Sequence, residues 1–486
     1  MVFSSLIFIY GFFSLSLLAY SLCRTRNSQN FVLLVFSLIF YGWGEPKYVL
    51  LLMFMALADW FCALRISRNE EKAMKKRWLI LAAGVDLLLI GYFKYAGLFC
   101  SLFGPVPAFV SRIILPIGIS FYTFQLLTYV VDVYRGEAEA QESYWNVLLY
   151  AALFHQCIAG PIVRYKTIDQ ELFRDPQRQP ELAEGVSRFA AGLAKKVLLA
   201  NPCGALADSL ILSASAISDP ALFAENLETL RTVPVLGAWG GMLAFSLHIY
   251  LDFSAYSDMA IGMGRMLGLH YLENFNYPYI SKSVTEFWRR WHMSLGTFFR
   301  DYVYIPLGGN RGSLPRVIFN TFVVWALTGL WHGASWNFLL WGLWFFLLLM
   351  AERYFLKDYL EESRILCHIY LPVMALLGWV IFRYTDIRLC KALLLSLFGL
   401  NGNPGSSFAV KIALQNNLFL LAAAVIGSTP LCKMVKERLD EGSHEDLLLG
   451  AIYDQAVYSV LPVILLILST ACLVGDSYNP FLYFQF

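Results

Sequence analysis

The sequence predicts an all-α, polytopic membrane protein, and the observations behind this are its composition and its long apolar runs. Of its 486 residues, 58% are hydrophobic and only 15% are charged. Soluble domains carry about 25% charged residues, so most of this chain is expected to lie in a bilayer. The net charge of +2 excludes no class of partner, and the sequence has no basic block that would suggest a nucleic-acid partner. The 9 cysteines have no C-x-x-C or other metal-ligand spacing, so no metal site is expected.

The apolar runs follow one another along almost the whole chain. They lie near 5–23, 30–43, 48–64, 78–99, 113–133, 144–163, 186–212, 235–268, 317–334, 336–356, 366–383, 388–400, 413–431 and 456–475. Some are too short to cross a bilayer upright, so we expect about eleven transmembrane helices plus re-entrant or amphipathic helices. Without an internal repeat or a linker, the simplest organisation is one transmembrane domain over residues 1–475 and a short aromatic tail over 476–486.

Basic residues in alternate loops indicate the orientation. Arg24 and Arg26 lie in one short loop, and a basic cluster lies between Arg65 and Arg77, two spans later. The connection between these loops, at 44–47, is poor in positive charge. By the positive-inside rule the basic loops face the cytoplasm, and the N-terminus and the C-terminus both lie outside.

The stretch from Tyr277 to Trp341 contains two histidines in contrasting surroundings. His332 lies in VIFNTFVVWALTGLWHGASW, an apolar segment long enough to reach into or across a bilayer. Gly329 and Gly333 flank it with the small-xxx-small spacing that lets another backbone approach closely. Because an imidazole can accept or donate a proton near neutral pH, His332 is a candidate catalytic base. The alternative is a packing helix whose histidine hydrogen-bonds a neighbouring carbonyl.

His292 lies in the preceding segment, which is too charged to span a bilayer. At helical spacing one face of this segment is largely apolar and aromatic, with Trp288, Trp291, His292, Leu295 and Phe299. The charged residues lie on the remaining surface and are Glu286, Arg289, Arg290 and Arg300. This pattern predicts an interfacial or partly inserted amphipathic helix. The residues that follow at 305–313, IPLGGNRGS, contain a proline and three glycines that forbid regular helix, so they predict the floor or wall of a cavity.

An apolar helix expected to start near Leu236 carries the polar residues His248, Asp252 and Asp258. His248 and Asp252 are four residues apart, so the carboxylate would hold the imidazole in one tautomer. A buried polar network that fixes helix packing is the favoured alternative, because no further ligand or H-E-x-x-H pattern suggests a metal. Four basic residues fit either cytoplasmic-face charges or contacts to the phosphates of a nucleotide-bearing donor: Arg164, Lys166, Lys195 and Lys196.

Long motifs connect these stretches to a known family. They run from Met1 to about Trp344 and include NYPYISKSVTEFWRRWHMSLGTFFRDYVYIPLGGNRG, LTGLWHGASWNFLLWG, LPIGISFYTFQLLTYVVDVYRGE, IAGPIVRY and HIYLDFSAYSDMAIGMGRMLG. Together they resemble the signature of the membrane-bound O-acyltransferase family, in the bacterial branch typified by alginate O-acetyltransferase. One departure is visible, since His155 in FHQCIAGP stands where the branch usually has a proline.

The resemblance implies a membrane O-acyltransferase built around a central tunnel. It implies transfer of an acyl group, most simply acetyl from acetyl-coenzyme A or an acyl-carrier thioester, across the bacterial cytoplasmic membrane. The acceptor would be a cell-surface polysaccharide, such as an alginate-like exopolysaccharide or peptidoglycan, and an extracellular SGNH-like esterase partner would complete delivery. The thioester is a substrate, and no bound cofactor is expected.

The resemblance also assigns roles within the segment from Tyr277 to Trp341. His332 would be the general base or a transient acyl carrier, and His292 would position or polarise the donor. Substrate contacts would come from Arg289, Arg290, Asn310, Arg311, Trp331 and Asn337.

The chain ends in DSYNPFLYFQF, whose aromatic residues form an interfacial belt on physical grounds. However, FLYFQF also resembles the C-terminal tyrosine motif of the small companion protein in teichoic-acid D-alanylation. That resemblance implies that Tyr483 carries the acyl group, as a carrier appended to the enzyme itself. A phenol ester is a more activated acyl donor than an alkyl ester, but the hydroxyl still needs a base to become a nucleophile.

Other functions remain as alternatives. A transporter or flippase for the polymer's precursors would also have polar groups at the membrane midplane, but such proteins often have paired broken helices in two related halves, and the sequence has no such pairing. D-alanyl transfer by a member of the same family is a second alternative, and a scaffold that recruits an acyltransferase is a third.

Overall fold

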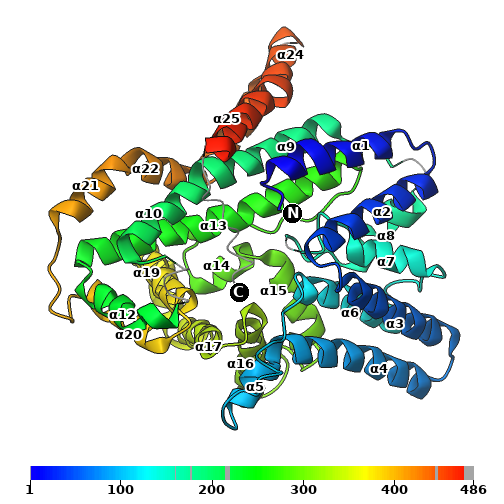
Figure 1. The fold of residues 1–486 in the computed structure, drawn as a ribbon, viewed down its shortest axis with the longest axis horizontal. Coiled ribbons are helices and arrows are strands. Elements are labelled where there is room, and N and C mark those ends of the chain that lie inside the picture. Colours follow the sequence, from blue (N-terminus) through cyan, green and yellow to red (C-terminus); the bar gives the residue numbers. More distant parts are fainter. Residues whose placement is uncertain (1, 159, 176–177, 214–218, 444–446, 476–486) are drawn as a thin grey trace. The chain divides into compact units, whose positions relative to one another are not determined.

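A computed structural model describes residues 2–158, 160–175, 178–213, 219–443 and 447–475, which are all-α and contain no β-strand (Figure 1). In this part of the chain, 6 helices are long and apolar enough to cross a membrane, or up to 8 if two bent helix pairs each form one span. The bent pairs are Phe223–Thr232 with Val235–Met266 and Phe408–Asn416 with Leu418–Gly427. The all-α, multi-pass prediction is confirmed, whereas the number of about eleven spans is not.

The chain forms two compact units. The first consists of Met1–Ala190 and Tyr256–Glu273, and the second of Ala191–Ala255 and Asn274–Phe486. Two helices contribute residues to both units, namely α9 (Leu182–Ala194) and α13 (Val235–Met266).

The first unit is built largely from the N-terminal helices. They are η1 (Ile7–Phe13), α1 (Ser14–Ser21), α2 (Arg26–Gly44), α3 (Val49–Arg68), α4 (Lys72–Ile90), η2 (Gly91–Tyr95), α5 (Ala96–Ser101), α6 (Ile119–Arg135), α7 (Tyr144–Ala152), α8 (Tyr165–Asp169) and η3 (Gln170–Arg174). Helices α3 and α4 run side by side (Figure 1).

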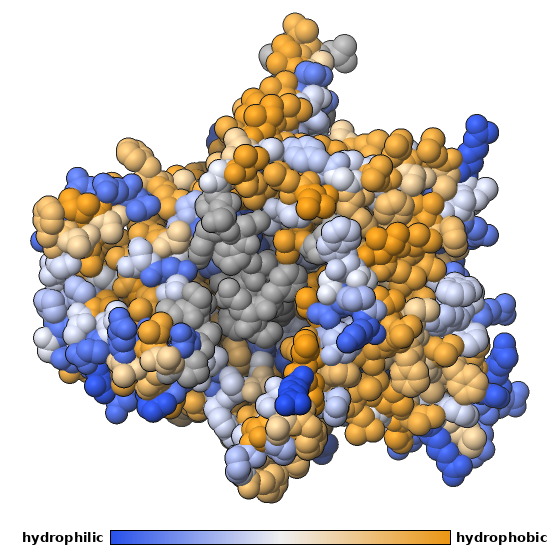
Figure 2. Space-filling model, in the orientation of Figure 1, coloured by the Kyte–Doolittle hydropathy of each residue, from blue (hydrophilic) through white to orange (hydrophobic). Residues whose placement is uncertain are grey.

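Helix α3 shows why this part of the chain belongs in lipid. One stripe of it is exposed although it is apolar: Leu50, Phe54, Leu57 and Phe61 are 40–70% exposed and lie at helical spacing. Figure 2 shows apolar residues over much of the visible surface of α3 and α4, with hydrophilic residues towards its edge. A contiguous apolar face of this kind on two long helices is what a bilayer covers.

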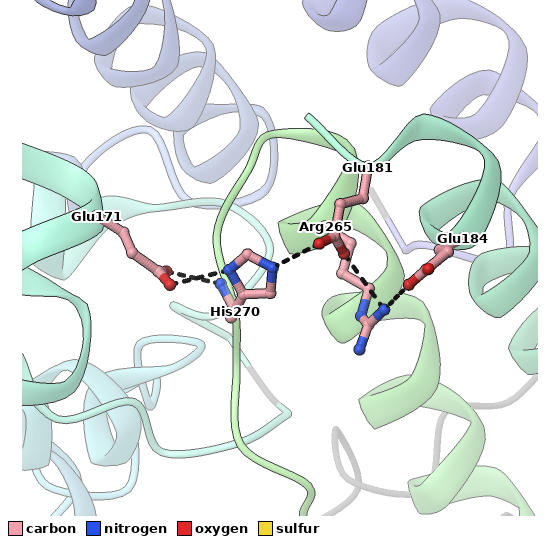
Figure 3. A network of polar contacts seen from close by, with 5 residues as sticks. All are labelled: Glu171, Glu181, Glu184, Arg265 and His270. Atoms are coloured by element: carbon pink, nitrogen blue, oxygen red, sulfur yellow. Dashed lines mark hydrogen bonds and ion pairs between the residues drawn. The ribbon is translucent and has the colours of Figure 1, made fainter. Parts of the chain in front are cut away.

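A polar network at the surface of the first unit joins the end of α13 to η3 and α9 (Figure 3). Glu171 accepts from the backbone N–H of His270 at 2.8 Å and lies 2.9 Å from His270 Nδ1, while Glu181 lies 3.1 Å from His270 Nε2. Arg265 pairs with both Glu181 and Glu184. Burial lowers the pKa of His270, but the hydrogen bonds and charges of Glu181 and Glu171 outweigh it and raise that pKa above 6.5.

The second unit contains the remaining helices. They are η4 (Lys195–Ala200), α10 (Asn201–Ile211), η5 (Pro220–Leu222), α12 (Phe223–Thr232), η6 (Pro278–Ile280), α14 (Val284–Arg290), α15 (Met293–Phe299), η7 (Arg300–Tyr304), α16 (Leu314–His332), α17 (Trp336–Ala351), η8 (Glu352–Leu356), α18 (Lys357–Glu362), α19 (Arg364–Arg383), α20 (Ile387–Leu397), α21 (Phe408–Asn416), α22 (Leu418–Gly427), α23 (Leu431–Ser443), α24 (Leu447–Gln455), η9 (Ala456–Val460) and α25 (Leu461–Gly475).

Helices α16 and α17 are packed backbone to backbone through glycines. A Cβ added at Gly329 would lie 2.3 Å from the carbonyl oxygen of Phe338, and one added at Gly342 would lie 2.3 Å from the carbonyl oxygen of Trp325. A Cβ at Gly333 would lie 2.1 Å from the Phe338 ring. The close approach predicted from the Gly329–Gly333 spacing is therefore confirmed, and α17 is the partner.

We expect Gly329→Ala to destabilise the protein, because the added methyl group meets rigid backbone. Overpacking of this kind typically costs about 1–3 kcal/mol. The matched control is Gly84→Ala in α4, where an added Cβ meets nothing within 4 Å. The comparison is the thermal unfolding midpoint of both variants in detergent. Equal midpoints for the two variants and the wild type would contradict the close-packing interpretation.

The network around His270 predicts a pH dependence. A group whose pKa is raised on folding stabilises the protein fully below its unfolded pKa, and this stabilisation is lost as the pH rises through the folded pKa. We therefore expect the unfolding midpoint of the wild type to fall as the pH rises above 6.5 through the raised pKa of His270, and His270→Gln to remove that part of the fall. The measurement is a series of melting curves at increasing pH. Parallel curves for wild type and variant would show that the ion pairs of His270 do not contribute.

Candidate active site

His332 is the last residue of α16 and is nearly buried, with 8% of its surface exposed. The chain leaves the helix at Gly333, which has extended backbone. Aromatic rings pack around the imidazole, among them Trp331 and Trp341 at 4.9 Å between ring centroids and Phe382 at 5.2 Å. The C-terminal end of a helix favours positive charge. This position would therefore stabilise the imidazolium that forms when His332 takes a proton.

His292 does not lie on the continuous amphipathic helix that its spacing predicts. Helix α14 ends at Arg290, Trp291 is extended, and α15 begins at Met293. Between them His292 has φ 46° and ψ 54°, the left-handed conformation that is uncommon for residues other than glycine. The prediction of one helix through His292 is wrong, and contacts from distant residues explain the break.

Asn274 provides the first of these contacts, at the start of α15. Its carbonyl oxygen accepts from Met293 N at 2.9 Å, and its Oδ1 accepts from Ser294 N at 3.2 Å and from Ser294 Oγ at 2.8 Å. The same Oδ1 lies 3.1 Å from His292 Nδ1. The first N–H groups of a helix have no partner within it, so Asn274 supplies the acceptors that let α15 begin here. Sequence reasoning missed Asn274, because its partners lie 18–20 residues further along the chain.

Glu352 provides the second contact, at the start of α14. Its Oε1 accepts from Val284 N at 2.5 Å, and its Oε2 accepts from Thr285 N at 2.8 Å and from Thr285 Oγ1 at 2.6 Å. The glutamate is only 4% exposed. A carboxylate is favourable at a helix N-terminus, where the unpaired N–H groups and the helix dipole both attract it. Both helices that flank His292 are therefore fixed at their N-termini by side chains from elsewhere in the unit.

The structure brings His292 and His332 to the same aromatic residue. The Trp331 ring lies 5.6 Å from the His292 ring and 4.9 Å from the His332 ring. Phe253 of α13 packs edge-on against His292 at 4.7 Å. His292 is 2% exposed, and this burial lowers its pKa to about 3, so its imidazole is neutral at physiological pH. The two histidines that stand out in the sequence thus share one aromatic, water-poor environment.

Further tryptophans extend this environment, and they pack against one another at ring distances of 4.9–6.2 Å. Trp288 packs on Trp325 and Trp341, and Trp379 packs on Trp291 and Trp341. Such a wall lowers the local dielectric constant and strengthens electrostatic interactions within it.

Two of the residues expected to contact substrate are buried, and one of them, Trp331, lies beside both histidines. Asn337, near the start of α17, is 2% exposed and donates through Nδ2 to the carbonyl oxygen of Ile381 at 3.2 Å. Asn337 therefore ties α17 to the end of α19.

The other residues expected to contact substrate lie nearer the surface. Arg290 pairs with Glu286 at 2.8 Å, and Asn310 accepts from Tyr304 Oη at 2.7 Å. Asn310 belongs to the turn after η7, where Gly308, Gly309 and Gly312 have positive φ angles, as a break in regular helix requires. Arg289 and Arg311, which were also expected to contact substrate, are exposed. Contact with substrate and the cavity role of 305–313 stay predictions.

The polar residues of α13 are arranged differently from the pairing that their spacing suggests. His248 Nδ1 lies 2.7 Å from the carbonyl oxygen of Ala200, so the backbone rather than Asp252 holds its tautomer. Asp252 instead pairs with Lys196 at 2.7 Å, and both side chains are at most 2% exposed. Lys196 is therefore a buried ion-pair partner rather than a charge on the cytoplasmic face.

Asp258 is paired separately from His248 and Asp252. Within the first unit, it forms an ion pair with Arg188 at 2.6 Å, and Arg188 also pairs with Glu273 at 2.7 Å. His155, the residue that departs from the family motif, is fully buried in the same unit, with its Nδ1 2.7 Å from the hydroxyl of Tyr271.

Two expectations concern metals and the tail. Among the described residues, no group of three or more His, Cys, Asp or Glu side chains is placed to hold a metal ion. Tyr483 and the whole segment 476–486 lie outside the described residues.

Comparisons with known proteins agree with this architecture. Residues 137–359 match the model of the membrane-bound O-acyltransferase family. The chain is 36% identical to the probable alginate O-acetylase AlgI of Azotobacter vinelandii over 100% of both chains, and 39% identical to its namesake in Pseudomonas aeruginosa over 82% of this chain and 75% of the other. It is 31% identical to the peptidoglycan O-acetyltransferase of Helicobacter pylori over 83% of this chain and 80% of that one.

Proposed function

Because this chain belongs to the membrane-bound O-acyltransferase family and is an O-acyltransferase, we propose that it moves an acetyl group across the bacterial cytoplasmic membrane for O-acetylation of a cell-surface polysaccharide. The donor is acetyl-coenzyme A or a related thioester on the cytoplasmic side. The acceptor is an alginate-like exopolysaccharide or peptidoglycan, as the names of its relatives suggest. The observation that carries the proposal is that His292 and His332 both pack against Trp331 in one aromatic environment.

In the proposed reaction His332 is the general base. It takes the proton of the Tyr483 hydroxyl, the first group to receive the acetyl, whose oxygen attacks the thioester carbonyl carbon. The new C–O bond forms, the C–S bond breaks, and the thiolate recovers the proton from the imidazolium. A thioester needs little activation, so holding donor and hydroxyl in line beside one base is sufficient. The end of α16 supports this role, because its dipole favours the transient positive charge on His332.

The route across the membrane completes the proposal. Both ends of the chain lie outside, as the basic loops predict, and the transfer site opens into a central tunnel. An SGNH-like esterase outside the membrane passes the acetyl group to the polymer. Tyr483 carries the group between the two, on the strength of the resemblance of FLYFQF to the tyrosine motif of the D-alanylation companion protein.

We expect His332→Ala to lower acetyl transfer by roughly 10²-fold or more, the usual contribution of a positioned base. His332→Gln should be nearly as damaging, because glutamine forms hydrogen bonds but does not shuttle protons. The measurement is acetylated product at matched membrane expression. His368→Gln is the control, because His368 is an exposed histidine of α19 in the same unit. Substantial activity in the Ala variant would remove His332 from the mechanism.

Tyr483→Phe distinguishes the relay from a simple interfacial anchor, because it keeps the aromatic ring and removes only the oxygen. If Tyr483 carries the acyl group, polymer acetylation stops in the variant. Wild-type protein given donor without its partner should then accumulate an acetyl group on its C-terminal peptide, which peptide mass analysis detects. An active Phe variant together with no adduct would eliminate the relay and leave the anchor.

A further inference from the structure

We propose that His292 acts as a hydrogen-bond acceptor through Nε2, that Asn274 is the positioning residue that makes it one, and that its partner is an amide N–H of the pantetheine arm of the acyl donor. The inference rests on the proposed function for the identity of the donor. The tautomer of His292 itself follows from the contacts of Asn274 alone.

The orientation of the Asn274 amide is fixed by the backbone. Its oxygen and nitrogen look alike in shape, so the assignment has to come from the hydrogen-bond partners. Ser294 N can only donate, and it faces Asn274 Oδ1 at 3.2 Å. Ser294 Oγ donates to the same atom at 2.8 Å. The atom that Asn274 presents to α15 is therefore its oxygen.

This orientation sets the tautomer of His292. Its Nδ1 lies 3.1 Å from Asn274 Oδ1, an atom that can only accept, and 3.4 Å from Ser294 Oγ, whose hydrogen is donated to the same Oδ1 at the shorter distance of 2.8 Å. Nδ1 must therefore carry the hydrogen. In a neutral imidazole the second nitrogen, Nε2, then carries the lone pair and has no hydrogen to donate.

The lone pair of Nε2 has no hydrogen-bond partner among the described residues. His292 is only 2% exposed, so this polar atom is buried. A buried polar atom without a hydrogen bond is costly, and such atoms in a native protein call for an explanation. The left-handed backbone at His292 adds strain at the same point. Both energetic costs are explained if Nε2 accepts a hydrogen bond from an N–H group of the bound substrate.

The tautomer of His292 limits the role that its imidazole can have in the reaction. A neutral imidazole in this tautomer cannot polarise the thioester by donating a hydrogen bond to its carbonyl oxygen. It can accept from an N–H group, and the pantetheine arm of coenzyme A or of an acyl carrier has amide N–H groups near the thioester. His292 therefore places the donor, while proton transfer is left to His332.

Three variants test the proposal by steady-state kinetics with acetyl-coenzyme A. Asn274→Ala frees the tautomer, so the KM for the donor should rise about tenfold, or about 1.4 kcal/mol, while kcat changes little. Asn274→Asp keeps the acceptors for α15 and holds the same tautomer, but its charge favours the imidazolium. It should work at alkaline pH and lose donor affinity at acidic pH, where Nε2 becomes protonated. Ser294→Ala is the control, because it removes the hydroxyl that lies 2.8 Å from Asn274 Oδ1 and 3.4 Å from His292 Nδ1 but leaves the Asn274 acceptor in place, and it should resemble wild type.

An Asn274→Asp variant with the pH profile of the wild type, or a Ser294→Ala variant as impaired as Asn274→Ala, would overturn the proposal and leave Asn274 a helix cap. A spectroscopic readout separates this failure from failure of the proposed function. The ¹⁵N shifts of His292, assigned by their loss in His292→Gln, should show a protonated Nδ1 and an unprotonated Nε2 even if acetyl-coenzyme A is not the donor. The opposite tautomer would refute the inference whatever the substrate is.

Discussion

The interruption of the helix at His292 is the constraint on which the site depends. A break in a helix exposes backbone N–H groups, and in a water-poor environment each of them needs a partner from the protein. At the start of α14, Glu352 accepts from two backbone N–H groups and the Ser283 side chain accepts from a third; at the start of α15, Asn274 accepts from two. His292 lies between two helix starts that are fixed independently of each other, so its left-handed backbone and its orientation are set by residues outside its own segment.

His332 is positioned by a different device. Helices α16 and α17 approach so closely that a single added methyl group at Gly329 or Gly342 would meet a carbonyl oxygen. This contact brings the end of α16 against Trp341 and places His332 within an aromatic wall. The two devices complement each other, since hydrogen bonds fix one histidine and backbone packing fixes the other. Trp331 packs against both imidazoles and therefore contacts both of the histidines that these two devices position.

The sequence indicated the features whose causes are local. Composition and apolar runs predicted an all-α membrane protein, and the Gly329–Gly333 spacing predicted a close backbone contact that α17 supplies. It also singled out both histidines. The helix break at His292 could not be predicted, because it depends on Asn274 and Glu352, which are distant in the chain. The burial of Lys196 escaped prediction for the same reason, since its partner Asp252 lies on another helix. Several of the short apolar runs form brief or bent helices within the units, and the described residues contain 6 to 8 candidate spans, so the prediction of about eleven spans is not confirmed.

The central claim is that His292 and His332 serve one acyl-transfer site, with the donor held by the first and activated beside the second. The most direct test is a cryo-EM structure of the protein with a non-hydrolysable acetyl-coenzyme A analogue. We expect an amide of the pantetheine arm within hydrogen-bond reach of His292 Nε2, about 3 Å, and the acyl carbon beside His332 against Trp331. An analogue bound in the first unit, or with its acyl group remote from both histidines, would contradict it.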